Sequence, residues 1–322
     1  MNVYIVGAGA VGTFLGHKLQ AIGNDVVYAP RDLAAVEPQD VDLAIVATKS
    51  FDTPGAIETL RRAVRDPAKT TIVTPQNGVG NEETLAAAFG AERILACALT
   101  VPVGIGDDGQ PVAANGGGIA FAPVDPAKAH NWVLAAFGAT GLKIASFSDY
   151  RSLKWSKLAL NIVANAACAI LNVLPERLVD LSDVYGLEIC AIREVRDVMK
   201  ARGIPVIDLP RYPVRALFAV ASLPVPAAKA LLAQRVAGAR GRKPPSLLLD
   251  LRAGKHQTEA GVLSGAVAAA ARESGLAAPV NAAYARVVSD IAEMPHLWPK
   301  YREHPDALAA EVAAERARSA KS

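Results

Sequence analysis

The chain has 322 residues, of which 52% are hydrophobic and 20% are charged, the composition of an ordinary globular protein large enough for two domains. Its 34 basic and 31 acidic residues nearly cancel to a net charge of +3, which argues against a nucleic-acid partner. No internal repeat is visible, so a repeat architecture is not expected.

Three further features concern the cellular compartment. The first apolar strand begins at residue 3, so we expect no signal peptide. The longest uncharged run, residues 158–174, contains three asparagines and is shorter than the roughly 20 residues of a membrane span. The three cysteines lie far apart among apolar neighbours, which favours reduced thiols over a disulfide or metal framework. We therefore expect a cytoplasmic protein without a membrane partner or a metal site.

The first elements are a short apolar strand, residues 3–6, and a helix that follows a glycine-rich turn. The turn is Gly7-Ala8-Gly9-Ala10-Val11-Gly12. This glycine spacing permits a tight turn, lets backbone N–H groups approach a pyrophosphate, and lets the helix pack closely on the strand. An ordinary strand-turn-helix can match the same pattern, but here a second strand, residues 25–29, follows directly. We therefore predict a Rossmann-type domain with these six residues at a dinucleotide cofactor.

Arg31 comes just after the second strand, where an NAD-specific site would place a carboxylate for the ribose 2′-hydroxyl. A guanidinium group matches a 2′-phosphate bidentately, which predicts NADPH as the cofactor. Asp32 is the alternative, because it would favour NADH if it faced the ribose in place of Arg31.

Apolar runs at residues 41–47 and 70–74 predict strands of a parallel sheet that is buried on both faces. Lys49 and Asn77 follow the carboxyl ends of these strands, at the edge where open α/β sheets bind ligands. Lys49 is thus placed to meet a phosphate, a ribose or a substrate anion, with a surface lysine as the alternative. Helices at 53–64 and 126–137, strands at 93–99 and 142–146, and short antiparallel strands between 101 and 123 complete a first domain over residues 1–148.

From residue 149 the pattern becomes helical, which predicts an all-helical second domain over residues 149–322. One long helix is expected from 149 to 172. Lys157, Asn161 and Asn165 recur every four residues along it and form a polar stripe on an otherwise apolar helix. Buried amide and ammonium groups need partners, which a substrate cleft supplies. In the alternative interpretation, the asparagines bond to neighbouring helices and the lysine reaches solvent.

Two later segments of this domain carry further candidate residues. Ser246 begins the run Ser246-Leu247-Leu248-Leu249-Asp250, and Thr258-Glu259 precedes another helix, where it can equally be ordinary N-terminal capping. The tail, residues 304–322, is alanine-rich with alternating charge. This pattern indicates a helix that is exposed or packs on a second subunit, which makes a homodimer a candidate assembly.

Taken together, the order and spacing of these residues resemble ketopantoate reductase, also called 2-dehydropantoate 2-reductase, of the 6-phosphogluconate dehydrogenase-like group. The resemblance covers nearly the whole chain up to about residue 300. It rests on the glycine turn, Arg31, Lys49, Gln76-Asn77-Gly78-Val79-Gly80, Lys157 with Asn161 and Asn165, and Ser246 to Asp250 followed by Thr258-Glu259 and Leu263-Ser264-Gly265.

The resemblance implies hydride transfer from NADPH to the 2-keto group of ketopantoate, giving pantoate for pantothenate biosynthesis. By this similarity Lys157 is the general acid, and Glu259 is a catalytic partner that positions the substrate or the lysine. Asn77, Asn161 and Asn165 contact the substrate or hold the lysine, and Ser246 helps to bind the substrate carboxylate. The chemistry agrees, because an ammonium group can stabilise and protonate the alkoxide that forms at the carbonyl.

The chain also differs from the family pattern. The connection from 31 to 41 is shorter than usual, which leaves the adenosine side of the cofactor more open, and one extra residue lies between Asp250 and Glu259. Two other functions stay open: a reductase of the same fold for another branched or aromatic 2-keto acid, and a dinucleotide-binding sensor without catalysis. Lys157 and Glu259 argue against the sensor, because a pure binder gains nothing from a general acid.

Overall fold

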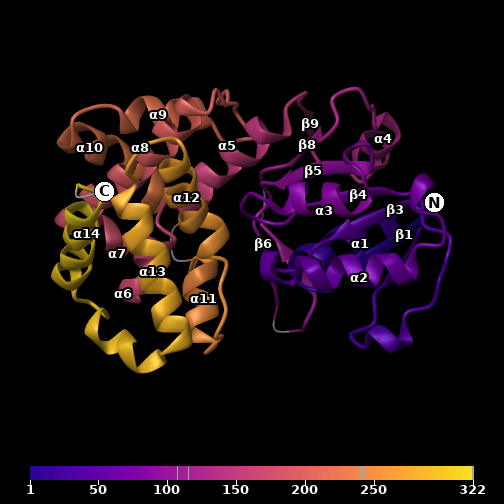
Figure 1. The fold of residues 1–322 in the computed structure, drawn as a ribbon, viewed down its shortest axis with the longest axis horizontal. Helices are drawn as coiled ribbons and strands as arrows, with labels where there is room; N and C mark the ends of the chain where they lie inside the picture. Colours follow the sequence, from indigo (N-terminus) through magenta and orange to yellow (C-terminus); the bar gives the residue numbers. More distant parts are fainter. Residues whose placement is uncertain (107, 115, 241–242, 321–322) are drawn as a thin grey trace. The chain divides into compact units, whose positions relative to one another are not determined.

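The computed structural model describes residues 1–106, 108–114, 116–240 and 243–320, and the chain forms two compact units (Figure 1). The first unit contains Met1–Lys157 and Ile207–Tyr212, and the second contains Leu158–Val206 and Pro213–Ser322. The predicted fold class, an α/β unit and a helical unit, is confirmed. The domain boundary expected after residue 148 stays a prediction. In the part of the chain that the structure describes, no helix is long and apolar enough to cross a membrane.

The first unit is built on one sheet, in which the described residues form seven strands in the order β2-β1-β3-β4-β5-β8-β9. The first five are parallel where they pair, β8 is antiparallel to β5, and β9 is parallel to β8. Because β1 lies between β2 and β3, the strand order reverses there, and such switch points bind ligands at the carboxyl edge of a sheet. The strands are β1 Asn2–Val6, β2 Asp25–Tyr28, β3 Leu43–Val46, β4 Thr71–Thr74, β5 Ile94–Leu99, β8 Ile119–Pro123 and β9 Ile144–Ser146, and β6 Val103–Ile105 pairs with β7 Pro111–Ala113 as a separate hairpin.

Helices cover both faces of the sheet, as the near-continuous apolar runs of its central strands require. Val3 and Ile5 of β1 belong to a core with residues of α1 (Ala10–Gln20) and α4 (Asn131–Ala139). Tyr4 and Val6 belong to a second core with residues of α2 (Thr53–Ala63) and α3 (Asn81–Phe89). The helix predicted at 126–137 is α4, which begins at Asn131, five residues later than expected, with His130 as its N-cap residue.

The connection from β2 to β3 contains only the 3-10 turn η1 (Leu33–Ala35), in agreement with its predicted shortness. A crossover between parallel strands usually contains a longer helix that covers the sheet. Here β2 lies at an edge of the sheet, and Val27 on it is 43% exposed. The short connection thus leaves the edge of the sheet around Val27 without a covering helix.

The second unit is a helical bundle around α13, which contacts η5, α6, α8, α11, α12, η6 and α14 (Figure 1). The predicted tail helix is α14, and it packs on α13 through the buried residues Leu308 and Val312. Arg286 of α13 adds ion pairs to Glu311 and Glu315 of α14. The elements are α6 Ala166–Leu171, α7 Pro175–Asp180, α8 Ser182–Ala201, α9 Val214–Ala221, α10 Val225–Arg240, α11 Ser246–Arg252, the π-helical turn η5 Gly261–Gly265, α12 Ala266–Glu273, α13 Pro279–Glu293, η6 Pro295–Lys300 and α14 Pro305–Ser319.

The long helix expected over 149–172 is wrong, because the chain forms α5 (Tyr150–Ile162) and α6 with a break between them. Ala164 in the break has a φ of 50°, which is left-handed and incompatible with helix. Its N–H donates a 2.5 Å hydrogen bond to Oε2 of Glu188, a buried residue of α8. A carboxylate from another helix thus takes the amide that would otherwise continue the helical ladder, and it stabilises the break.

Candidate active site

The glycine turn connects β1 to α1 as predicted, and its glycines meet different constraints. Gly7 has a φ of 106°, a conformation that favours glycine. Gly12 packs so closely that a Cβ atom there would lie 1.9 Å from the carbonyl oxygen of Gly7. At Gly9 the backbone is extended, and a Cβ atom would meet nothing within 4 Å. Packing inside the protein therefore requires glycine at positions 7 and 12, whereas position 9 borders open space.

The N-terminus of α1 fits an anion. Gly9 is its N-cap residue, so no side chain caps the helix, and no acidic residue lies in its first turn. Uncapped N–H groups and the positive end of the helix dipole attract negative charge. With the open space at Gly9, this end can hold the pyrophosphate of a dinucleotide among the residues from Gly7 to Gly12.

Arg31 and Asp32, the two candidates for contact with the ribose, differ in their surroundings after β2. Arg31 is exposed. Asp32 is the N-cap residue of η1, and its Oδ1 accepts a 2.9 Å hydrogen bond from the backbone N–H of Ala34. The carboxylate that would favour NADH is therefore engaged within its own turn.

Gln76 joins the loops that follow β3 and β4. Its side chain is buried, and Nε2 donates to the carbonyl oxygen and hydroxyl of Thr48 at 3.2 Å and to the Thr53 hydroxyl at 2.9 Å. Its Oε1 accepts from the hydroxyl of Thr74 at 3.0 Å. These bonds hold together the two loops that carry Lys49 and Asn77 at the carboxyl edge of the sheet.

Asn77 is fixed through its own backbone. Its carbonyl oxygen accepts hydrogen bonds from the Ser50 hydroxyl at 2.9 Å and from Nδ2 of Asn81 at 3.0 Å. The side chains of Asn77 and Lys49 are both half-buried. Both residues thus belong to one hydrogen-bonded turn region, as their positions at neighbouring strand ends predict.

A buried ion pair, which the sequence analysis missed, connects α5 to these loops. Nζ of Lys154 lies 2.8 Å from Oε1 of Glu82, and the two side chains are only 3% and 1% exposed. The same Nζ donates to the carbonyl oxygen of Gln76 at 2.6 Å and lies 3.5 Å from that of Cys97. Burial raises the pKa of the Glu82 carboxyl, and the Lys154 ammonium group opposes that rise. The available signal was a lysine between two apolar residues, Leu153 and Trp155, three positions before Lys157.

Lys157 is half-buried on α5, one turn after Lys154. It is the last residue of Met1–Lys157, the longer of the two segments that make up the first unit. Burial raises the pKa of the Cys97 thiol on β5 to about 12, and the charges of both lysines act against that rise. Both ammonium groups of α5 are therefore within electrostatic reach of the same strand. Asn161 follows one turn later on the same helix, half-buried, and belongs to the second unit.

The structure brings Asn165 together with the start of α11. Asn165 is buried at the N-cap of α6, and its Oδ1 accepts a 3.3 Å hydrogen bond from the N–H of Leu247. Ser246, the neighbour of Leu247, begins α11 and is half-buried. The polar stripe expected on one helix therefore ends at Asn161. The bond to another helix is the alternative that the sequence left open for Asn165.

Glu259 is 4% exposed and lies just before η5, a π-helical turn in which the Gly265 N–H bonds to the Ala260 carbonyl over 2.9 Å. Single π turns inside helices occur often at functional sites. Upstream, Asp250 is 5% exposed and forms an ion pair with Lys255 at 2.5 Å. The ion pair and the π turn lie on the two sides of the segment that leads to Glu259.

The candidate residues divide between the units. The glycine turn, Arg31, Lys49, Asn77 and Lys157 belong to the first unit, and Asn161, Asn165, Ser246 and Glu259 belong to the second.

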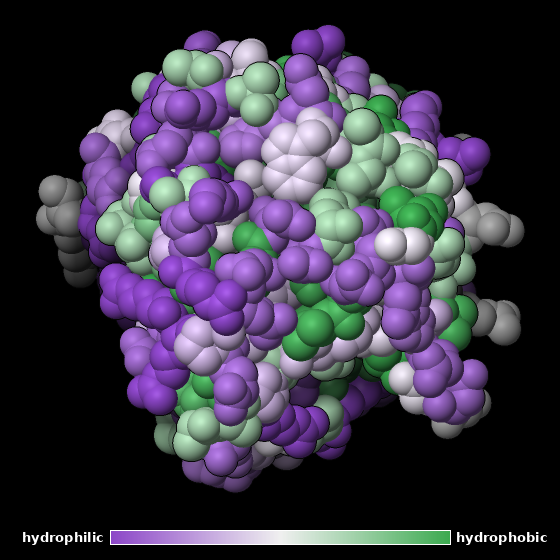
Figure 2. Space-filling view, turned by 90° about the vertical axis from the view of Figure 1, so that its right-hand side faces the viewer, coloured by the Kyte–Doolittle hydropathy of each residue, from purple (hydrophilic) through white to green (hydrophobic). Residues whose placement is uncertain are grey.

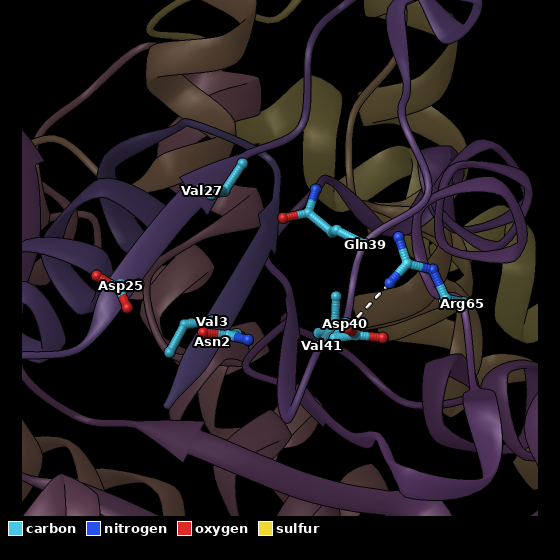
Figure 3. Close-up of a pocket in the computed structure, with 8 residues that line it drawn as sticks. All are labelled: Asn2, Val3, Asp25, Val27, Gln39, Asp40, Val41 and Arg65. Atoms are coloured by element: carbon cyan, nitrogen blue, oxygen red, sulfur yellow. Dashed lines mark hydrogen bonds and ion pairs between the residues drawn. The ribbon is translucent and has the colours of Figure 1, made fainter.

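A cavity of about 340 Å³ lies away from these residues, at the amino edge of the sheet (Figure 3). Asn2, Asp25 and Gln39 are among its lining residues, and Arg65 forms an ion pair with Asp40 beside it. Val27, the exposed residue of the edge strand β2, also lines it. The side of the molecule seen in Figure 2 is mostly hydrophilic, with apolar groups scattered over it. Because the candidate cofactor residues are at the carboxyl edge, this cavity is not the candidate active site.

Comparison with known proteins identifies the family of the chain. Residues 27–126 match the family model described as ketopantoate reductase PanE/ApbA, and residues 149–292 match the model of its C-terminal domain. The chain belongs to the ketopantoate reductase family. Members of this family are dinucleotide-dependent oxidoreductases, and the resemblance predicted from the sequence is confirmed.

Individual relatives extend the match over most of the chain. A 2-dehydropantoate 2-reductase of Archaeoglobus fulgidus is 25% identical over 304 residues, covering 87% of this chain and 94% of the relative. The crystal structure of 2-dehydropantoate 2-reductase from Geobacter metallireducens is 25% identical, has a TM-score of 0.74 and covers 90% of this chain and 99% of its own. The ternary structure of a D-mandelate dehydrogenase with NADH and anilino(oxo)acetate has the same fold, with a TM-score of 0.74, 19% identity, and coverage of 96% and 99%.

Proposed function

We propose that the protein reduces 2-dehydropantoate to pantoate with NADPH, by hydride transfer to the 2-keto group. The observation that carries the proposal is the pair of lysines on α5. Lys154 anchors this helix to Gln76 at the carboxyl edge of the sheet, and Lys157 stands one turn further in the same unit as the glycine turn. A general acid and a dinucleotide-binding edge thus occur together in a member of the ketopantoate reductase family.

The residues that would hold the dinucleotide are the glycine turn, Arg31, Lys49 and Asn77. The α1 N-terminus receives the pyrophosphate, and the half-buried Lys49 adds a positive charge at the switch point. When bound, the nicotinamide supplies the hydride for the substrate carbonyl carbon.

Lys157 is the general acid in this proposal. Reduction turns the keto oxygen into an alkoxide, and an ammonium group at hydrogen-bond distance stabilises the developing charge and then donates its proton. In this proposal Glu259 has the role of orienting the lysine or the substrate; it is buried just before η5. Positioned proton donors of this kind contribute roughly a hundred- to ten-thousand-fold to turnover.

Three polar residues bind the keto acid directly, and a fourth, Asn165, acts through another residue. Asn77 and Asn161 offer half-buried amides, and Ser246 offers a hydroxyl at the first turn of α11 for the substrate carboxylate. Asn165 acts through its hydrogen bond to Leu247, which sets the position of that first turn. This division gives Asn165 a supporting part and leaves the direct contacts to the other three.

The preference for NADPH rests on the end of β2. Arg31 is exposed and carries a guanidinium group that matches a 2′-phosphate, whereas Asp32 is engaged with Ala34. An exposed arginine beside a carboxylate whose Oδ1 caps its own turn favours the phosphorylated cofactor.

Steady-state kinetics with a panel of 2-keto acids tests the proposal. 2-Dehydropantoate should give the highest kcat/KM, and NADPH should be preferred to NADH. The panel includes 2-oxoisovalerate and phenylglyoxylate, because the fold also occurs in D-mandelate dehydrogenase. A higher kcat/KM for phenylglyoxylate would assign the chain to the alternative, an aromatic 2-keto acid reductase, and no turnover with any member would favour a sensor.

The place of action is the cytoplasm in this proposal, supported by the three cysteines, which form no disulfide with one another and of which Cys97 and Cys168 are buried. A homodimer stays a prediction, and sedimentation analysis of the purified protein tests it.

A further inference from the structure

We infer that Lys154 and Glu82 are positioning residues for Lys157, because their buried ion pair clamps α5 to the turn that carries Gln76 and Asn77. The inference rests on the proposed reductase function. It adds two residues to a site whose other members were expected from the sequence.

The bonds of Lys154 come from three separate elements. An ammonium group has three donor N–H bonds. The acceptors around this one are Oε1 of Glu82 on α3 at 2.8 Å, the carbonyl oxygen of Gln76 after β4 at 2.6 Å, and that of Cys97 on β5 at 3.5 Å. A rotation or slide of α5 would stretch all three contacts at once, so the pair fixes both the position and the rotation of the helix.

Stability alone does not explain this pair. Burying two charges requires that both lose their hydration, and apolar residues of similar volume are often as stabilising or more so. Lys154 is 3% exposed and Glu82 is 1% exposed, so both side chains lose almost all of their hydration. What charged groups provide beyond apolar contact is direction, because Nζ must meet its acceptors at hydrogen-bond distances.

The clamp acts on the loop side through Gln76. The carbonyl oxygen of Gln76 binds Lys154, while its side-chain amide binds Thr48 in the loop after β3 and Thr53 at the start of α2. Lys49 lies in that loop. A single residue thus transmits the position of α5 to the loop of a candidate cofactor-binding residue.

The clamp also connects the turn that carries Asn77 to the proposed proton donor, Lys157. Asn77 directly follows Gln76, and its carbonyl is held by Ser50 and Asn81, so this turn has little freedom of its own. Lys157 follows Lys154 by three residues, which puts both on the same side of α5. The spacing between the proton donor and the Asn77 turn is therefore set by the bond between Lys154 and Gln76.

The test uses the double variant Lys154→Met with Glu82→Gln, which removes both charges at similar volume and leaves no unpaired ion in the core. We expect kcat for 2-dehydropantoate to fall about 10- to 100-fold, because small misplacement of a catalytic group has effects of this size. The Kd of NADPH should rise by a smaller factor than kcat falls, because the glycine turn and Arg31 are untouched and only the loops of Lys49 and Asn77 depend on the clamp. The solvent isotope effect on kcat should rise, since proton donation from a misplaced ammonium group becomes slower.

Ser156→Ala is the matched control on the same helix. Ser156 is fully buried, and its Oγ accepts a 3.1 Å hydrogen bond from the N–H of Ile207, in a segment that holds none of the candidate site residues. This variant also removes a buried polar contact of α5, so a general loosening of the helix would slow both proteins. We expect kcat and the isotope effect of Ser156→Ala to stay close to those of the wild type.

Turnover of the double variant at the wild-type rate would overturn the inference. If the double variant does not fold, Glu82→Gln alone should lower kcat by a smaller factor, and an unchanged kcat would count against the inference. Hydrogen exchange gives a readout without activity: residues 76–81 and 150–157 should exchange faster in the double variant than in Ser156→Ala. Should the wild type reduce no keto acid, the proposed function fails, and equal exchange in the two variants would still overturn the clamp.

Discussion

The backbone N–H of Leu247 donates a 3.3 Å hydrogen bond to Oδ1 of Asn165, so the residue after the break in the helix fixes the start of α11. Because Asn165 is 5% exposed, its replacement by alanine would leave a buried N–H without a partner. We expect Asn165→Ala to lower the free energy of unfolding by about 1–3 kcal/mol. The KM for the keto acid should rise more than kcat falls, because Ser246 lies in the same first turn. Urea unfolding and steady-state kinetics measure the two effects, and Asn165→Asp, which keeps the acceptor, should recover part of the stability.

Replacement of Lys157 should separate catalysis from folding. We expect Lys157→Ala to keep its melting temperature and NADPH affinity while kcat falls roughly a hundred- to ten-thousand-fold, the usual contribution of a positioned proton donor. Lys69→Ala, which removes a surface ammonium group with an 83% exposed side chain, is the control and should be unaffected. Turnover of Lys157→Ala near the wild-type rate would show that another group donates the proton.

Arg31 and Asp32 allow a paired test of cofactor choice. We expect Arg31→Ala to weaken NADPH binding about 10- to 100-fold, since a charge-assisted hydrogen bond contributes about 1.5–3 kcal/mol, and to leave NADH binding nearly unchanged. Asp32→Ala should leave the NADPH/NADH ratio as it is and remove only the cap of η1. Isothermal titration with both cofactors decides the point, and a large change of the ratio in Asp32→Ala would mean that the carboxylate faces the ribose.

The glycine turn permits a similar contrast between folding and binding. A Cβ atom at Gly12 would lie 1.9 Å from a backbone oxygen, whereas one at Gly9 would meet nothing within 4 Å. We therefore expect Gly12→Ala to destabilise the fold at the upper end of the usual overpacking range, about 3 kcal/mol. Gly9→Ala should keep the wild-type melting temperature and lose most NADPH affinity. Thermal unfolding with and without NADPH distinguishes the two, and unchanged NADPH affinity in Gly9→Ala would place the pyrophosphate elsewhere.

Glu194 predicts a pH dependence of stability. Its carboxyl accepts hydrogen bonds from the N–H groups of Val280 and Asn281 at the start of α13, both 2.9 Å long. Burial raises the pKa of Glu194 to about 7, although these bonds oppose the rise. A carboxyl whose pKa is higher in the folded state gives its full stabilisation below the unfolded value, near 4.5, and loses it as pH rises to about 7.

Glu194→Gln keeps an acceptor for α13 but does not titrate. We expect the stability of the wild type relative to this variant to decrease between pH 4.5 and 7, by at most about 3 kcal/mol, since one pKa unit corresponds to about 1.4 kcal/mol. Urea unfolding of both proteins at pH 5 and pH 7.5 measures the difference. A difference that is equal at the two pH values would show that the carboxyl is already charged at pH 5.

Local patterns in the sequence were sufficient for much of the first unit. The strand at β3, the helix at α2 and the glycine turn follow from apolar periodicity and from backbone geometry that each segment carries in itself. The reversal of the strand order at β1 follows from the same signals, because a short strand–turn–helix at the start of the chain is typical of dinucleotide-binding sheets.

The break after α5 could not be predicted in the same way. Residues 158–174 are uniformly apolar apart from asparagines, and Ala164 is a strong helix former. The break depends on Glu188, which is 24 positions away and reaches Ala164 only after the helices pack. Lys154 was missed for a related reason, because its partners Glu82, Gln76 and Cys97 are 57 or more positions away.

The π-helical turn η5 allows the segment after Glu259 to lose a residue, whereas the glycine turn has no spare length of this kind. Five residues, Gly261–Gly265, fill a turn for which an α-helix uses 3.6, so the chain holds about one residue of slack there. Deleting one of these residues would tighten the turn to α geometry, and α12 could keep its place against α13. The start of α1 has no free space at Gly12, because even one added carbon atom there collides with the backbone. Changes of chain length near the candidate catalytic glutamate are therefore absorbed locally, whereas the glycine turn has no room for even a methyl group at position 12.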